Sequence, residues 1–186
     1  MTSAKSYQLR IQLRRVEPPV WRTLRVPADI KLTKLHKIFQ AVMGWSDSHL
    51  HEFRIGAIRY GIPDPDFQED NAVTSEKRAV LGDVLKPSIS LFLYLYDFGD
   101  GWEHEVLIEK AAAVAEGDRP LLCLAGANAC PPEDVGGPYG YAEFLKAIAN
   151  PKHKEHKRYL RWCGGAFDPA GFDLQAVNRE LARIGA

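Results

Sequence analysis

The chain has 186 residues, of which 46% are hydrophobic and 26% are charged, and its 24 Lys and Arg balance its 24 Asp and Glu. This composition excludes a disordered or collagen-like chain, and no apolar run reaches the roughly 18–20 residues that a membrane span needs. At this length a hydrophobic core can stabilise a domain without disulfides, so we predict a single domain over residues 1–186. Because the cysteine count of three is odd and the first ten residues lack the apolar stretch of a secretory signal, we expect a cytoplasmic protein.

The first fifth of the chain is basic. Residues 1–38 hold nine Lys and Arg and two acidic residues, so this part carries a net charge of +7 and the rest carries −7. Residues 7–14 alternate between apolar and polar side chains, which predicts a half-buried strand, and residues 20–26 after a Pro-Pro turn predict its hairpin partner. The basic outer face of this hairpin and the Lys/Arg-rich residues 152–161 are one candidate surface for nucleic-acid phosphates. Its candidate residues on the hairpin are Arg10, Arg14, Arg22 and Arg25.

The next segments combine a helix, a strand and a loop. Thr33 is placed to cap a helix that Gly44 ends, because the apolar residues between them fall on one helical stripe. Residues 49–55 end in the alternating pattern of a strand. Residues 61–79 contain five acidic residues and few apolar ones, which predicts a long surface loop.

A hairpin around Asp100-Gly101 gives the sharpest local signal. Residues 88–96 form a nearly continuous apolar run, which is typical of a strand covered on both faces in the centre of a sheet. An Asp-Gly pair supplies the positive backbone angles of a two-residue hairpin turn. In that register Asp97 lies directly opposite His104, which predicts a carboxylate–imidazole pair at the end of the hairpin.

The remaining chain is rich in helices. Its predicted elements are a helix at 111–115, a short strand at 121–124, a loop at 130–140, a helix at 141–149, an exposed helix at 152–161, a loop at 162–172 and a final helix capped by Asp173. Strands that come as hairpins, with helices interspersed and appended, indicate an α+β fold with a largely antiparallel sheet on which the helices pack.

Four segments carry a family resemblance: His49–Phe53, Tyr96–His104, Cys130–Gly137 and Gly164–Asp173. In this order, over roughly residues 7–183, the chain resembles the plasmid pRiA4b ORF-3-like proteins, some of which are labelled as the TnpR-like passenger of an IS1096-type insertion element. The resemblance implies an α+β fold and an accessory protein of mobile elements, but no particular reaction. Many relatives have a Cys where Val135 stands here, so any metal bound through that loop in those relatives would lack one ligand in this chain.

The first candidate site is a metal centre. His49 and His51 are two residues apart, so on a strand both imidazoles lie on one face, and His-x-His is a common element of metal sites. With His104 they are the three metal-ligand candidates, and a divalent metal is the one cofactor that we consider. The alternative is that one histidine is a buried hydrogen-bonding residue and the other lies at a strand end, and the incomplete ligand set favours this alternative.

The second candidate is the pair of Asp97 and His104. A carboxylate that fixes the tautomer of an imidazole allows general acid–base catalysis near neutral pH. Such a pair also satisfies buried polar groups at the end of a sheet, and we favour this structural interpretation because no nucleophile can be assigned beside it.

The third candidate is an acidic pocket. Glu133 and Asp134 follow a stiff Pro-Pro pair, and with Asp168 and Asp173 they would offer carboxylates to Mg²⁺. Against this, Asp173 is adequately explained as a helix cap and Asp168 as a turn former. The three cysteines, Cys123, Cys130 and Cys163, lack the spacing of a zinc ribbon and are better explained as small buried residues.

These signals favour a non-catalytic binding or accessory module of mobile-element ancestry. We expect its polar cleft to lie where four segments meet: the strand of His49 and His51, the hairpin end with Asp97 and His104, and the loops 130–137 and 164–173. The alternatives are a metal-dependent hydrolase or nuclease, and a nucleic-acid-binding protein that uses the basic hairpin. The expected partner of the protein is nucleic acid or a mobile-element protein, and not a membrane. The predicted ligand-binding residues are His49, His51, Asp97, Asp100, Trp102, His104, Glu133, Asp134 and Asp168. The catalytic candidates for the enzyme alternative are Asp97, His104, Glu133 and Asp134.

Overall fold

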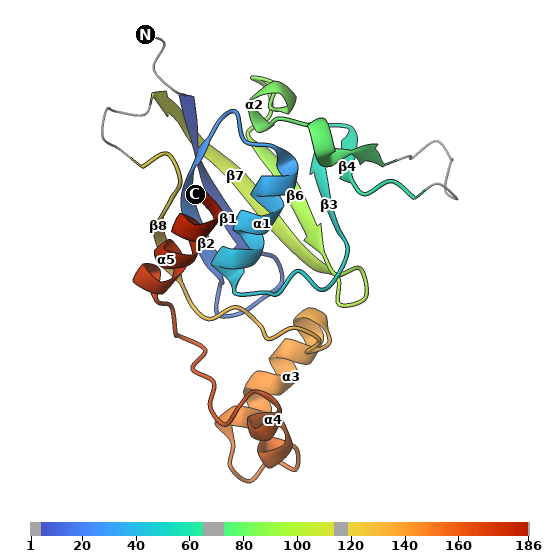
Figure 1. Ribbon diagram of the computed structural model, residues 1–186. Coiled ribbons are helices and arrows are strands. Elements are labelled where there is room, and N and C mark those ends of the chain that lie inside the picture. Colours follow the sequence, from blue (N-terminus) through green and yellow to red (C-terminus); the bar gives the residue numbers. More distant parts are fainter. Residues whose placement is uncertain (1–4, 65–72, 114–118, 186) are drawn as a thin grey trace.

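The computed structural model describes residues 5–64, 73–113 and 119–185 (Figure 1). These residues form one open sheet of eight strands in the order β5-β4-β3-β6-β7-β1-β2-β8, in which every pair is antiparallel except the parallel pair β4–β5. The strands are β1 Lys5–Leu13, β2 Trp21–Pro27, β3 His51–Ile55, β4 Ile58–Gly61, β5 Thr74–Ser75, β6 Leu91–Tyr96, β7 Trp102–Ala113 and β8 Leu122–Ala127. The predicted α+β fold with a largely antiparallel sheet is confirmed.

Five α-helices accompany this sheet in the described part of the chain. They are α1 Leu32–Met43, α2 Leu81–Val84, α3 Gly137–Ala149, α4 His156–Trp162 and α5 Leu174–Gly185, and a 3₁₀ helix spans Glu76–Arg78. Helices α1 and α5 lie side by side over one face of the sheet, while α3 and α4 extend below its lower end in Figure 1. No helix among the described residues is long and apolar enough to cross a bilayer.

The core lies between α1 and the inner face of the sheet. On β1 the side chains of Leu9, Ile11 and Leu13 are buried while the residues between them are partly exposed, as the alternating sequence predicts. The α1 residue Phe39 packs its ring against Phe53 on β3, at 6.1 Å between ring centroids. Burying one such aromatic side chain contributes about 2 kcal/mol.

Helix α1 begins differently from the sequence prediction. Thr33 is not its cap: the helix begins at Leu32, and Lys31 at the N-cap makes no side-chain capping hydrogen bond. The main chain of another segment replaces the cap, because Leu32 N donates to Ala79 O at 2.9 Å. Gly44 ends the helix in the left-handed conformation, with φ 86°, as predicted.

Strand β6 is central, as predicted, but it is not covered on both faces. Phe92, Tyr94 and Tyr96 are buried, whereas Leu91 on the other face is exposed. The reason is that α1 and α5 cover only one face of the sheet (Figure 1). Long apolar side chains on the open face therefore shield one another only partly, and the continuous apolar run does not indicate two covered faces.

Tertiary pairing also changes the predicted elements after β7. The predicted helix at 111–115 is wrong for residues 111–113, which continue β7 and pair with Lys5–Tyr7 of β1, and residues 114–115 lie outside the described residues. Cross-strand pairing thus outweighs the helical propensity of alanine. The strand predicted at 121–124 is confirmed as β8.

The other boundaries shift by a few residues. Helix α3 begins at Gly137, four residues earlier than predicted, and α4 covers only the second half of the range 152–161. Asp173 caps α5 as predicted, since its Oδ1 accepts the Ala176 N–H at 2.9 Å. The loop predicted at 61–79 lies partly outside the described residues, and its described end forms β5 and the 3₁₀ helix.

Candidate metal centre

The hairpin that joins β6 to β7 has a wider loop than the sequence predicts. Tyr96 pairs with Trp102 and Tyr94 with His104, so five residues, 97–101, connect the strands. Asp97 takes a left-handed conformation, with φ 52°, and its Oδ1 accepts the N–H groups of two loop residues, Gly99 and Asp100, at 2.9 and 3.3 Å. This side-chain cap outcompetes the two-residue Asp-Gly turn. The predicted register, with Asp97 opposite His104, is therefore wrong, and the two side chains do not form a dyad.

The second carboxylate oxygen of Asp97 instead faces His49. His49 Nε2 lies 3.7 Å from Asp97 Oδ2 and 3.1 Å from Asp134 Oδ1. The three ligand atoms lie within 4.8 Å of one another. Nevertheless, His49 Nε2 is buried and makes no hydrogen bond of normal geometry to any described residue. We call this group the open cluster, because its side chains range from 10% exposed at Asp97 through 31% at His49 to 71% at Asp134.

Three loops are held together to form the open cluster. Asp97 N donates to Leu50 O at 2.9 Å, which ties the β6–β7 loop to the segment of His49. Asp100 Oδ2 accepts the Gly136 N–H at 3.1 Å, which ties the same loop to the segment of Asp134. Next to it, a Cβ on Gly137 would lie 2.2 Å from Asp100 O, and Gly137 has φ +67°, so this close approach of two main chains requires glycine.

Glu133 lies beside the open cluster, but its carboxylate is already engaged in hydrogen bonds. Its carboxylate accepts hydrogen bonds from the main-chain N–H of Ser46 at 3.2 Å, from the Ser46 hydroxyl, and from Tyr96 OH at 2.5 Å. Burial acts to raise the pKa of Glu133, but these hydrogen bonds outweigh it and hold the pKa below its ordinary value. Burial and the carboxylate beside it raise the pKa of Tyr96. Glu133 thus stays ionised as an acceptor that anchors its loop.

His51 belongs to a different group of residues. Its ring stacks on His36 with 3.5 Å between centroids, and its Nε2 lies 2.9 Å from Glu76 Oε2. His36 Nε2 lies 2.6 Å from Asp47 Oδ1 and its Nδ1 lies 2.8 Å from Tyr94 OH. We call the group of His36, Asp47, His51 and Glu76 the closed cluster, since three of its four side chains are buried. The pKa of His36 is lowered, chiefly by burial and secondly by the neighbouring His51.

The prediction that His49 and His51 share one face is therefore wrong. His49 precedes β3, which begins at His51, so the two-residue alternation of a strand does not extend to it. Glu76 also corrects the loop prediction, because this acidic residue is buried against His51 and is not at the surface.

His104 and Trp102 are core residues. His104 is fully buried beside the rings of Trp45 and Tyr94, and its Nδ1 lies 3.1 Å from Tyr94 O. Its Nε2 has no hydrogen-bond partner among the described residues, and burial lowers the pKa of the imidazole to about 3. Trp102 is buried against Trp45, with 5.8 Å between ring centroids. His104 is thus neutral at physiological pH and lies in neither cluster.

The fourth motif segment does not join the open cluster. Asp168 is exposed, and its Oδ1 accepts the Ala170 N–H at 3.0 Å within its own turn. Phe167 of the same segment packs against Phe144 of α3, at 5.1 Å between ring centroids. Since Asp173 caps α5, the four carboxylates predicted to form an acidic pocket do not come together. The cysteines are free, and burial raises the pKa of Cys123 to about 11 and also raises that of Cys130.

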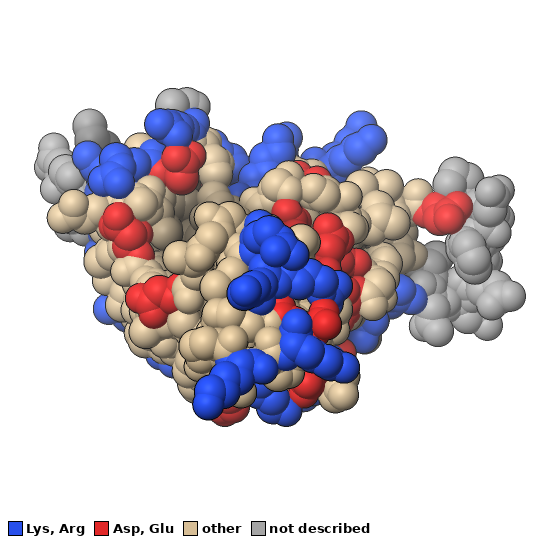
Figure 2. Space-filling model, turned by 90° about the horizontal axis from the view of Figure 1, so that it is seen from below, with Lys and Arg blue, Asp and Glu red and all other residues tan. Residues whose placement is uncertain are grey.

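The candidate arginines of the N-terminal hairpin already make hydrogen bonds, ion pairs or stacking contacts within the protein. Arg22 is 3% exposed, and its guanidinium donates to four main-chain carbonyls, so it is not available to a phosphate. Arg14 pairs with Glu103 at 2.9 Å, and Arg10 stacks on Trp21 at 4.0 Å. Arg25 donates to a main-chain carbonyl. On the end that carries α3 and α4, Figure 2 shows Lys and Arg gathered together with some carboxylates.

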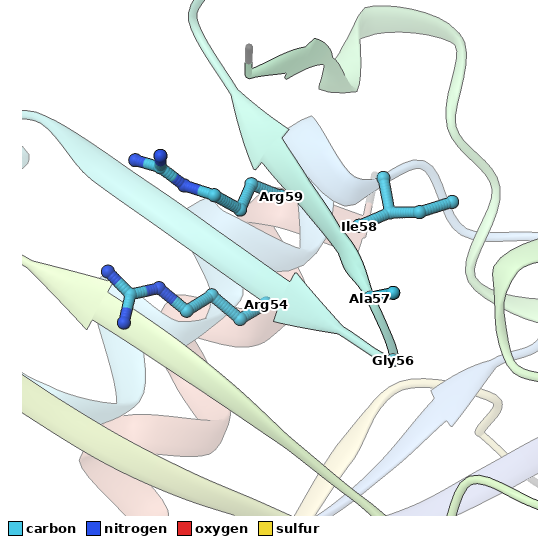
Figure 3. A pocket seen from close by; sticks show the side chains of 5 residues that line it. All are labelled: Arg54, Gly56, Ala57, Ile58 and Arg59. Atoms are coloured by element: carbon cyan, nitrogen blue, oxygen red, sulfur yellow. The ribbon is translucent and has the colours of Figure 1, made fainter. Parts of the chain in front are cut away.

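The outer face of the β3–β4 hairpin holds an ion-pair network that the sequence reasoning missed. Glu52 is 2% exposed, and its carboxylate accepts from Arg54 Nε at 2.6 Å and from Arg59 Nε at 2.8 Å. Arg54 and Arg59 are directly opposite each other on the two strands, and Figure 3 shows both side chains extended in the same direction beside the turn. Two arginines on one face are tolerated because the carboxylate lies between them. The alternating positions 52 and 54 were the available signal.

The closed cluster was also missed. His36 and Gln40 are four residues apart on one face of α1, which is a weak signal for a polar pair. Their partner Asp47 lies after the helix, and Glu76, the partner of His51, lies in a still later segment, so no local spacing connects these residues. Such contacts become visible only in the folded chain.

Comparisons with known proteins agree with this fold. The family model of the plasmid pRiA4b ORF-3-like proteins matches residues 5–176. The uncharacterized protein y4hQ of Sinorhizobium fredii (strain NBRC 101917 / NGR234) is 40% identical over 184 residues, which is 98% of this chain and 94% of that protein. A crystal structure of MM3350, a protein of unknown function from Methanosarcina mazei Go1, is similar with a TM-score of 0.84 at 36% identity, covering 94% of this chain and 97% of that one. The chain therefore belongs to the plasmid pRiA4b ORF-3-like protein family.

Proposed function

We propose that the protein is a binding module that depends on one divalent cation, held by His49, Asp97 and Asp134. One observation carries this proposal: a buried imidazole nitrogen lies between two carboxylate oxygens, at 3.1 and 3.7 Å, without a hydrogen bond of normal geometry to either. A neutral imidazole and two carboxylates form a mixed nitrogen and oxygen donor set, which suits Mn²⁺, Fe²⁺ or Zn²⁺.

The environment of the open cluster favours binding over catalysis. Three protein ligands leave coordination positions for a ligand or water. The ionisable groups around them are engaged elsewhere: Glu133 accepts three hydrogen bonds, and Asp100 accepts the Gly136 N–H. His104 is neutral and buried. No described side chain beside the three ligands is thus placed as an independent general base.

A metal-dependent hydrolase is the second candidate. The observation that favours it is the exposure of Asp134, which leaves one side of the cluster open to solvent. A metal-bound water has a lowered pKa and can itself act as a nucleophile.

A role in mobile elements rests on the family resemblance alone. Nucleic-acid binding by the N-terminal hairpin is the weakest candidate because Arg22 is buried.

Titration of Mn²⁺ into chelator-treated protein, followed by calorimetry, tests the metal centre. We expect one Mn²⁺ per chain, with an affinity that falls at least about 100-fold in His49→Ala and about 10-fold in Asp134→Asn, because each removes or weakens one ligand. Asp168→Asn is the matched control, since Asp168 is also an exposed loop carboxylate but lies outside the cluster. Equal Mn²⁺ affinity in wild type and His49→Ala would exclude the site.

Turnover of p-nitrophenyl phosphate in the same samples separates the two candidates. A Mn²⁺-dependent rate that disappears in His49→Ala would establish the hydrolase. Stoichiometric metal without turnover agrees with the binding module.

A further inference from the structure

A pocket adjoins the open cluster on the side of α4. Its volume is about 310 Å³, and it is lined by Asp134, Val135, Gly136, Arg158, Tyr159 and Trp162. One wall is thus the loop that carries Asp134, and the other is a helix with a cation and two aromatic rings. This volume lies at the small end of the range of pockets that hold small molecules.

Trp162 gives the pocket a fixed aromatic surface. The side chain is 46% exposed, yet its ring is held by edge contacts with Phe144 and Tyr159, at centroid distances of 5.9 and 6.3 Å and interplanar angles of 75° and 70°. An indole ring that packs against neighbouring aromatic rings and is exposed on part of its surface is suited to stacking with a planar ring, and nucleobases stack on such side chains.

Arg158 gives the pocket a positive charge. Its Nε pairs with Glu155, and its Cζ lies 4.8 Å from the centroid of the Tyr159 ring. These contacts orient the guanidinium of this side chain, which is 63% exposed, and its two terminal nitrogens have no partner within the described parts of the chain. Those nitrogens match the geometry of two phosphate oxygens. Figure 2 shows that Lys and Arg side chains gather on the same end of the molecule, with carboxylates between them.

Asp134 connects the pocket to the open cluster. It lines the pocket, and its Oδ1 is also 3.1 Å from His49 Nε2. A cation bound by Asp134 would therefore lie beside a residue of the pocket wall. Phosphate oxygens are the usual additional ligands of such a cation.

We propose that this pocket binds a nucleoside diphosphate, with its base on Trp162 and its phosphates between Arg158 and the cation at Asp134. This inference rests on the proposed metal centre, because the cation supplies one of the two contacts to the phosphates. A small ligand with both a planar ring and phosphates would use the aromatic ring of Trp162, the guanidinium of Arg158 and, through the cation, the carboxylate of Asp134.

Calorimetric titration of ADP into the Mn²⁺-loaded full chain tests this assignment. We expect saturable binding at one site per chain, with a Kd that rises at least tenfold in Trp162→Ala and in Arg158→Gln. Arg161→Gln and Tyr139→Ala are the matched controls, because they remove an exposed arginine of α4 and an exposed aromatic residue of α3 that do not line the pocket. Both controls should leave the Kd within twofold.

Two further titrations distinguish the failure of this inference from that of the metal centre. Mn²⁺ binding of unchanged affinity in Trp162→Ala, together with loss of ADP binding, would support both proposals. Mn²⁺ binding to wild type without ADP binding would overturn the nucleotide assignment and leave the metal centre intact. ADP binding of equal affinity with and without Mn²⁺ would overturn the bridging role of the cation.

Two other ligands test what the pocket recognises. Ribose 5-phosphate should bind at least tenfold more weakly than ADP, and equal affinity would overturn the role of Trp162. A ten-residue oligothymidylate should not compete with ADP at equal concentration. Stronger binding of this single strand, weakened by Arg161→Gln, would overturn the assignment in favour of a nucleic-acid surface.

Discussion

The two histidine clusters of this protein use the same kinds of residue in different surroundings. In the closed cluster, His36 and His51 stack on each other, and their Nε2 atoms lie within hydrogen-bond distance of Asp47 and Glu76. In the open cluster, His49 Nε2 lies near two carboxylates without a normal hydrogen bond to either. The closed cluster joins α1, the loop after it, β3 and the 3₁₀ helix, whereas the open cluster joins three loops.

This difference is the ground on which we propose a structural role for the closed cluster and a ligand-binding role for the open one. Buried polar groups are almost always hydrogen-bonded, since an unpaired group costs about 1–3 kcal/mol. The closed cluster follows this rule, and its groups therefore contribute to stability. The open cluster departs from it at an accessible place, which is where such a departure points to a ligand. Three changes to the protein or to its solution test this contrast.

Removing a carboxylate from the closed cluster has the largest expected effect. Glu76→Ala should lower the free energy of unfolding by about 3 kcal/mol, because it leaves His51 Nε2 buried without its partner and creates a cavity. Urea denaturation at pH 7.5 measures this change. Glu109→Ala is the control, since Glu109 accepts a side-chain hydrogen bond from Gln8 at the surface, and its effect should stay within about 0.5 kcal/mol. A loss below 1 kcal/mol for Glu76→Ala would contradict the structural role.

Acidification has an intermediate effect, which comes from the buried histidines. The pKa of His104 is lowered to about 3, and that of His36 is also lowered. Well above pH 6.5 these imidazoles are neutral in both the folded and the unfolded state. Below that pH the unfolded chain binds protons that the folded protein does not bind, so the free energy of unfolding falls as the pH falls. Between pH 7.5 and 5.5 the free energy of unfolding should decrease by about 1.4 kcal/mol for His104 alone.

Urea denaturation at several pH values measures this slope. The variant His104→Gln lacks the titrating group. The slope of its free energy of unfolding against pH should therefore correspond to about one proton fewer than in wild type over this interval. Identical slopes for wild type and variant would show that native His104 binds its proton as readily as the unfolded chain does.

The smallest expected effect is that of Asp134→Asn in the presence of chelator. Asp134 is largely exposed, and asparagine tolerates its φ of 59°, so the free energy of unfolding should change by less than about 0.5 kcal/mol. With Mn²⁺ at 100 times the wild-type Kd, wild type should gain about 2.7 kcal/mol and the variant clearly less. Melting curves with and without Mn²⁺ measure both quantities. A large loss of stability in chelator would place Asp134 among the structural residues.

Regular alternation and local turn signals carried most of the fold prediction. The alternating residues 7–14 gave β1 with its buried face, and Gly44 and Asp173 marked a helix end and a helix start correctly. The errors arose where a longer-range contact outweighs a local preference. Residues 111–113 pair with β1 instead of forming a helix, and the carboxylate of Asp97 caps a five-residue loop where Asp-Gly favours a shorter one.

The candidate site was predictable as a set of residues and as a meeting place of motif segments, three of which do come together, but not in its pairing of side chains. His49, Asp97 and Asp134 were all named from their motifs, yet the sequence placed His49 with His51 and Asp97 with His104. The actual grouping depends on how three loops meet, and that depends on contacts such as the one between Gly137 and Asp100, which no spacing along the chain reveals. Glu76 was missed because the segment around it, residues 61–79, has the composition of a surface loop.

The position of Asp134 between the open cluster and the α4 pocket has a thermodynamic consequence. Two ligands that share one side chain do not bind independently, and the coupling between them is reciprocal. Whatever factor Mn²⁺ applies to the affinity for a nucleotide, the nucleotide must apply to the affinity for Mn²⁺. At limiting concentrations of both, each ligand therefore governs the occupancy of the other, so the protein would respond to their joint presence more sharply than to either alone.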